Sequence, residues 1–253
     1  MKVIKQIITS IANVLSKPFY FLAALASLVG FFIIFASDKD KVLWSFVFFN
    51  LLLLILIGSL IYSIFKLLNN STTDFESNSA FIRYETLDGN KITHEVYKHI
   101  QCKRPILSKY EYKFKWSGTH FPIVTSDLQI VENVLDKKNP STYDKAVLRF
   151  RTPLLFNENS VVHFRAELDD TDKRAEPYVS NRIVRPIDII HYRVVLQHKE
   201  DNANAVLERR KIDSISNSFE KIKEIAFNKV SKSYEYPLLN PELGYMYRIS
   251  WER

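Results

Sequence analysis

The sequence predicts a membrane α-hairpin of two transmembrane helices, followed by an all-β soluble domain: a small antiparallel β-barrel of about eight strands with one short helix. Two long uncharged apolar runs near the N-terminus indicate the hairpin. In the rest of the chain, apolar and polar residues alternate, which is typical of half-buried strands. The single cysteine, Cys102, excludes an intrachain disulfide framework, and a formal net charge of +7 does not require a nucleic-acid partner.

The two apolar runs are residues 18–36 and 42–65, and neither contains a charged side chain. At about 1.5 Å per residue the shorter run spans roughly 28 Å, close to the thickness of the hydrocarbon core. Only residues 37–41 separate the runs, so the helices of the hairpin, 17–68, are expected to be antiparallel. The first run starts too far from the N-terminus for a cleaved signal, and no small-residue cleavage site follows it.

Basic residues beside the two runs predict the orientation of the hairpin. More of them flank its outer ends than its turn, and cytoplasmic segments carry the excess of basic residues. The outer ends hold Lys2, Lys5, Lys17, Lys66 and Arg83, and the turn holds Lys39 and Lys41. We therefore expect the N-terminus and the β-domain to lie in the cytoplasm.

Residues 1–16 form a separate segment with apolar residues at three- and four-residue spacing. This spacing predicts a short amphipathic helix on the membrane surface. The apolar positions are Ile4, Ile7, Ile8, Ile11, Val14 and Leu15. The alternative is a frayed tail, because short helices are marginal on their own.

Small and polar residues inside the runs are candidates for helix association. Ala23 and Ser27 lie four residues apart, as do Ala26 and Gly30, a spacing that allows close helix packing. Asn50 needs a hydrogen-bond partner in lipid, either within its own hairpin or in another copy of the chain. Neither run contains Asp, Glu, Lys, Arg or His, which argues against a proton-coupled transporter.

Residues 69–79 are polar and without period, which predicts a linker, and residues 80–253 form the soluble domain. The sharpest alternation, Lys109 to Trp116, places four aromatic side chains on one face and four charged ones on the other. An Asp88-Gly89-Asn90 turn joins the first two strands. The predicted strands are 80–87, 91–100, 109–116, 146–151, 162–168, 190–196, 205–212 and 243–251, and the predicted helix is 217–229.

The arrangement of these strands remains open between a barrel and a sandwich. Strands without intervening helices predict an antiparallel sheet system. We favour the barrel, because closure removes the exposed edges and a small barrel holds one ligand.

No catalytic motif is present. Phosphate-binding glycine loops and nucleophile elbows are absent. His94 and His99 are five residues apart, one too many for a zinc-protease helix. Cys102 has no placed histidine beside it in the sequence. We therefore expect no enzyme, no metal and no cofactor.

Arginine and aromatic residues predict a ligand-binding face instead. Guanidinium groups bind phosphate with two hydrogen bonds, and aromatic rings stack on bases. The alternative is that the arginines lie on a solvated sheet face and the aromatics in the core. The candidate residues are Tyr112, Trp116, Arg149, Arg151, Arg165, Tyr178, Arg182, Arg185, Arg193, Tyr245 and Trp251.

Together, the paired runs, the short tether and the strand-rich domain resemble the two-transmembrane, β-strand-rich effectors of bacterial CBASS anti-phage operons. The resemblance covers essentially the whole chain and is one of layout. It rests on the runs 18–36 and 42–65 and on three segments: 112–118 (YKFKWSG), 145–155 (KAVLRFRTPLL) and 241–251 (PELGYMYRISW).

The resemblance implies a multi-pass protein of the bacterial inner membrane. It implies that the barrel binds a cyclic oligonucleotide made during infection, that the chain then self-associates, and that clustered hairpins disrupt the membrane and kill the cell. The partners implied are this messenger, the lipid bilayer and other copies of the chain, with no DNA or RNA polymer. The alternatives are a membrane-anchored, lipocalin-like carrier or sensor of an apolar ligand, and a membrane scaffold protein.

Overall fold

The computed structural model describes residues 30, 38–69, 73–136, 143–214 and 218–253. The chain divides into two compact units, residues 1–72 and 73–253, which we describe separately. The first expected run, 18–36, lies outside the described residues apart from Gly30, as do residues 1–16, Ala23 and Ser27.

The first unit contains one described helix, α2 (Asp38–Asn69). Its segment Asp40–Lys66 is long and apolar enough to cross a membrane, and most of its side chains are exposed. The helix already includes Asp38 to Lys41, which were expected to form the turn of the hairpin. A second spanning helix is not shown by the described residues, so the two-helix hairpin and the multi-pass topology stay predictions.

Asn50 has one hydrogen-bond partner within its own helix. Its side-chain amide donates a hydrogen bond of 2.8 Å to the backbone carbonyl of Phe46, one turn earlier. One of the two amide N–H donors therefore has a partner without a second helix.

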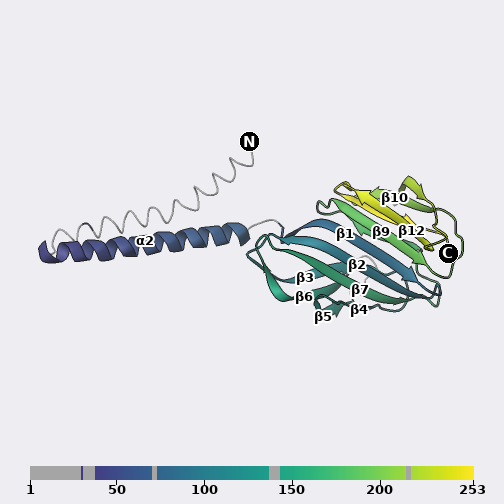
Figure 1. Ribbon diagram of the computed structural model, residues 1–253, viewed down its shortest axis with the longest axis horizontal. Helices are drawn as coiled ribbons and strands as arrows, with labels where there is room; N and C mark the ends of the chain where they lie inside the picture. The colour runs from purple at the N-terminus through teal and green to yellow at the C-terminus, as the bar shows by residue number, and fades with distance from the viewer. Residues whose placement is uncertain (1–29, 31–37, 70–72, 137–142, 215–217) are drawn as a thin grey trace. The chain divides into compact units, whose positions relative to one another are not determined.

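The second unit is mostly β, as predicted, but its described residues form three sheets (Figure 1). The six-stranded sheet has the order β12 (Ser233–Leu239), β9 (Ile189–Leu196), β1 (Phe75–Thr86), β2 (Lys91–Cys102), β7 (Asn159–Asp169), β4 (Ile123–Thr125). The four-stranded sheet has the order β11 (Glu220–Ile225), β10 (Ala205–Lys211), β13 (Tyr245–Ser250), β8 (Tyr178–Arg182). The three-stranded sheet has the order β3 (Ile106–Phe114), β6 (Asp144–Leu155), β5 (Ile130–Leu135).

The centre of the largest sheet is the hairpin of β1 and β2. Gly89 adopts a φ of 75°, and the Asp88 carboxylate accepts backbone hydrogen bonds from Asn90 and Lys91. The expected Asp-Gly-Asn turn is thus confirmed. The pair β1–β9 is parallel, whereas the other pairs in this sheet are antiparallel.

Several expectations about this unit are wrong. The described strands do not close into a barrel, because they separate into three sheets. The described residues contain thirteen strands, where about eight were expected. Phe75 to Ser79 were expected in the linker but extend β1, where they pair with β2. The expected helix 217–229 contains strand β11 instead, because pairing with β10 supplies its backbone hydrogen bonds.

The two faces of the six-stranded sheet differ sharply. Ile82, Val96 and Phe164 point to one face and are almost fully buried in the core. The opposite face carries a row of charges that crosses neighbouring strands at the same level. The row runs Glu235, Arg193, Arg83, Glu95 and Arg165, from β12 to β7.

Candidate ligand-binding cavity

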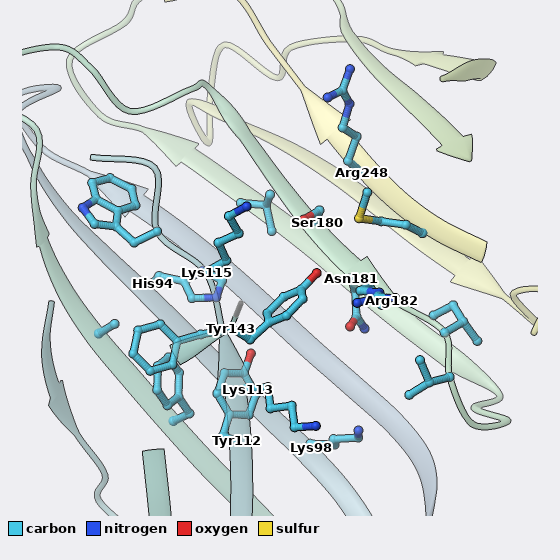
Figure 2. A pocket seen from close by; sticks show the side chains of 18 of the residues that line it. His94, Lys98, Tyr112, Lys113, Lys115, Tyr143, Ser180, Asn181, Arg182 and Arg248 are labelled. Atoms are coloured by element: carbon cyan, nitrogen blue, oxygen red, sulfur yellow. The ribbon is translucent and has the colours of Figure 1, made fainter. Parts of the chain in front are cut away.

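A cavity of about 790 Å³ opens in the soluble unit between strands of all three sheets. The inward face of β1, β2 and β7 forms one wall, β3 with the segment after it forms another, and β8, β10 and β13 complete it. Figure 2 shows side chains from these walls projecting into the same space. Its volume lies within the range of about 300–1,000 Å³ that is usual for small-molecule sites.

The lining of the cavity is strongly basic. Seven cationic side chains line it, against the two carboxylates of Glu111 and Glu176. The cations are Lys98, Lys113, Lys115, Arg182, Arg185, Arg210 and Arg248. Converging positive charge with so little negative charge favours an anionic ligand.

Five of these cations form no ion pair with any carboxylate of the described residues. They are Lys98, Lys113, Lys115, Arg182 and Arg185. Basic residues on the rest of the unit are typically paired, as Arg149 is with Glu132 at 2.7 Å. Structural ion-pair networks therefore do not account for the charge inside the cavity.

Lys98 and Arg185 share one aromatic ring. Lys98 Nζ lies 5.7 Å from the ring centroid of Phe75, and Arg185 Cζ lies 4.5 Å from the same centroid. Burial, and secondarily the charge of Arg185, lowers the pKa of Lys98 from 10.5 to about 8. Two cations are thus held close together where water is scarce.

Arg248 is held in place at another part of the wall. Its guanidinium lies 3.6 Å from the ring centroid of Phe219 and 5.4 Å from that of Tyr178. Its Nε donates a 2.7 Å hydrogen bond to Glu208 Oε1. Nearby on β8, Arg182 lies over the ring of Tyr143 at 5.4 Å. Stacked guanidinium groups keep their in-plane N–H groups available for a phosphate.

The aromatic side chains of the lining offer stacking surfaces and neutral polar groups. Tyr112 stacks on Phe164 with a centroid separation of 4.1 Å, and burial raises its pKa. Burial also lowers the pKa of His94 to about 4, so its ring is neutral at neutral pH. The Nε1 of Trp116 is buried without a hydrogen-bond partner in the described part of the chain. Such groups suit the edges and faces of nucleobases.

Gly118 determines where the Trp116 ring lies. A Cβ atom at position 118 would lie only 2.5 Å from the indole ring. Only glycine therefore allows the chain to fold back against this ring, which lines the cavity.

The cavity brings together five of the eleven residues predicted as ligand-binding. These are Tyr112, Trp116, Tyr178, Arg182 and Arg185. The other six do not line it: Arg149, Arg151, Arg165, Arg193, Tyr245 and Trp251.

These six residues have other surroundings. Arg165 and Arg193 belong to the charged row on the outward face of the six-stranded sheet, where Arg193 pairs with Glu235 at 3.0 Å. Tyr245 lies beneath Arg209, with 4.9 Å from guanidinium to ring centroid. Trp251 is buried against Tyr84, with 4.8 Å between ring centroids. Arg149 pairs with Glu132, and Arg151 is exposed.

Sequence reasoning missed several lining residues, and β2 carried a signal for two of them. Its inward positions are Ile92, His94, Val96, Lys98 and Ile100. A histidine and a lysine thus interrupt an otherwise apolar inward face. Lys113, Lys115 and Arg248 alternate with apolar residues as surface charges do, and Arg210 lies between two other charged residues, so only the fold reveals them.

One cluster outside the cavity resembles a metal site. Ligand atoms of Glu95, Asp127 and His163 lie within 4.8 Å of one another. However, His163 Nδ1 accepts a 2.8 Å hydrogen bond from the Asp127 backbone N–H, so Nε2 carries the ring proton and faces Glu95 Oε1 at 3.1 Å. Neither ring nitrogen has a free lone pair, and the cluster fixes the loop before β5.

Comparisons with known proteins do not assign the chain to a family. No protein-family model matches it, and no curated protein is significantly similar in sequence. Among solved structures, it is similar to an M1 zinc metallopeptidase from Deinococcus radiodurans, with a TM-score of 0.39 and 10% identity over 71% of this chain and 43% of the enzyme. A variant of that enzyme bound to a Tyr-Ser-Ala substrate gives a TM-score of 0.38 and 10% identity, over 70% and 42%. The chain spans less than half of these proteins, and such remote likenesses indicate no activity.

Proposed function

We propose that this protein is a membrane effector that responds to a cyclic oligonucleotide, as its resemblance to the CBASS two-transmembrane effectors implies. The observation that carries the proposal is the cavity: unpaired cations and aromatic rings line one space of suitable volume. Phosphate groups need the cations, and bases need the rings. No step of this function requires a catalytic residue, a metal or a cofactor.

The membrane part of the proposal is supported by α2. Its segment Asp40–Lys66 presents exposed leucine, isoleucine and phenylalanine side chains along its length. In this account ligand binding favours self-association of the chain, and the clustered helices disrupt the bacterial inner membrane. A ligand shifts such an equilibrium only by the difference in its affinity for the two states.

The cavity argues against the alternative of a lipocalin-like carrier of an apolar ligand. An apolar ligand would leave the charge of Lys98 without a counter-charge in a partly desolvated space, which is energetically costly. We therefore propose that the natural ligand is an anion that also contains nucleobases.

Calorimetric titration of the full chain in detergent micelles tests the proposal directly. The panel consists of cyclic di- and trinucleotides, with a nucleoside monophosphate for comparison. We expect at least one cyclic compound to bind, and Arg182→Glu in the cavity wall to weaken it at least tenfold. Arg151→Glu, an exposed arginine outside the cavity, is the matched control and should bind as the wild type does. Absence of binding by every cyclic compound would contradict the proposal.

A further inference from the structure

The start of β1 carries an arrangement that the cavity as a whole does not explain. Phe75 is the first residue of β1, and Lys98 and Arg185 both lie over its ring. Arg185 Nη1 also donates a hydrogen bond of 3.4 Å to the Phe75 carbonyl. Neither cation has a carboxylate partner within the described residues. Two like charges that share one ring repel each other, and an anion between them would remove this repulsion.

A buried hydroxyl lies on the same part of the wall. Ser77 is 5% exposed and lines the cavity, and its Oγ has no hydrogen-bond partner in the described part of the chain. A buried, unpaired hydroxyl costs free energy unless something binds it. Ser77 pairs with Ile100 and Ala80 with Lys98, so Ser77 and Lys98 point to the same face of the sheet.

We propose that Lys98, Arg185 and Ser77 form a phosphate subsite, and that its occupation fixes the first strand that follows the membrane unit. The two cations supply charge and forked N–H donors, and the hydroxyl donates a further hydrogen bond. This inference rests on the proposed function only for the identity of the natural ligand, because the subsite recognises the phosphate group alone.

The geometry explains why binding at this subsite acts on the chain near the membrane unit. Phe75 is two residues from Thr73, where the soluble unit begins. The neighbouring Asp74 pairs with Arg104 through its carboxylate. The backbone carbonyl of Asp74 accepts a 3.0 Å hydrogen bond from the N–H of Lys103. A phosphate that holds Arg185 and Lys98 in place also holds the ring and carbonyl of Phe75. Occupation of the subsite therefore reduces opening of β1 at its N-terminal end.

Pyrophosphate is the probe, measured against the detergent-solubilised full chain by calorimetry. We expect the wild type to bind it, and Lys98→Met and Arg185→Gln each to weaken binding at least tenfold. Lys98→Arg should restore most of the affinity, and Arg151→Gln should leave it unchanged. Hydrogen exchange of peptides covering residues 73–79 should slow when pyrophosphate is bound, by a larger factor than peptides covering β5.

The outcomes separate this inference from the proposed function. Wild-type affinity in both Lys98→Met and Arg185→Gln, or no pyrophosphate binding by the wild type, overturns the subsite. Unchanged exchange at residues 73–79 in the bound state overturns its effect on β1. If pyrophosphate binds through Lys98 and Arg185 but no cyclic oligonucleotide binds, the subsite stands and the proposed function fails. If a cyclic oligonucleotide binds Lys98→Met as tightly as it binds the wild type, the subsite fails and the proposed function stands.

Discussion

Replacing Lys98 by methionine should make the empty protein more stable while it removes ligand affinity. The lysine lies on the inward face of β2, beside Arg185 and without a carboxylate partner among the described residues. Methionine keeps the length and apolar stem of the side chain but removes the charge. A charged residue that destabilises the fold and lines a cavity is typical of a binding site, because ligand binding needs a charge that core packing would not favour.

The magnitude follows from the pKa of Lys98, which falls from 10.5 to about 8 in the folded protein. Each pKa unit corresponds to about 1.4 kcal/mol, so the charged amine costs about 3 kcal/mol of folding free energy at neutral pH. For a unit of this size, 1 kcal/mol shifts Tm by about 2–4 °C. We therefore expect Lys98→Met to raise the Tm of the soluble unit by about 6–12 °C.

The pH dependence has a definite sign. The folded-state pKa lies below the unfolded-state value, so between about pH 8 and 10.5 the unfolded chain binds more protons than the folded one. The stability contributed by Lys98 in the wild type therefore rises across this interval, whereas the methionine variant has no such amine. The difference in Tm between the two proteins should shrink from pH 8 towards pH 10.5.

Thermal unfolding of the full chain in detergent, followed by near-ultraviolet circular dichroism, measures both effects. Lys113→Met is the matched control, because Lys113 also lines the cavity but is exposed, and its replacement should change stability by under about 0.5 kcal/mol. A Tm for Lys98→Met equal to or below that of the wild type would refute the reasoning. So would a gain in Tm that stays constant from pH 8 to 10.5.

Three further predictions follow from particular contacts. Affinity for the anionic ligand should fall as pH rises through about 8, because Lys98 then loses its charge. Calorimetry from pH 7 to 9.5 measures this affinity, and a constant value would contradict a role for the amine. Gly118→Ala should displace the Trp116 ring, shift its fluorescence and cost about 1–3 kcal/mol of stability. An unchanged fluorescence spectrum would show that position 118 does not confine the ring. Asn50→Leu should leave depolarisation by the full chain intact, because the Asn50 amide already bonds to the Phe46 carbonyl; loss of depolarisation would assign the amide to helix association.

The strands were predictable wherever one face is buried and the other solvated. The alternation in β3 and β7 gave correct strands because each side chain has only one of two faces to occupy. The Asp88-Gly89-Asn90 turn was predictable because its glycine supplies a positive φ and its aspartate caps the turn. These are local effects, and the sequence contains them fully.

The arrangement of the strands was not predictable in the same way. Residues 217–229 carry apolar side chains at helical spacing, yet β10 offers them an edge to pair with, and no local pattern encodes that partner. Likewise, β1 pairs in parallel with β9, more than a hundred residues away in sequence. The choice between one closed barrel and three sheets depends on such distant pairings.

The candidate site was predictable only in part for a similar reason. Arg165 and Arg182 both occur in strands, but Arg165 points away from the core and Arg182 into the cavity. The sequence pattern does not say which face of a strand borders an unfilled space. Lys98 was not predicted either, although its position among the inward residues of β2 marks a charge where packing alone would favour an apolar side chain.

The central claim is that ligand binding in the cavity controls an action on the membrane. The most direct test expresses the full chain in bacteria, with and without an enzyme that makes cyclic oligonucleotides, and follows membrane potential with a dye. The account predicts depolarisation only when the enzyme is present, and its loss in Arg182→Glu but not in Arg151→Glu. Depolarisation that is independent of the enzyme, or unaffected by Arg182→Glu, would contradict it.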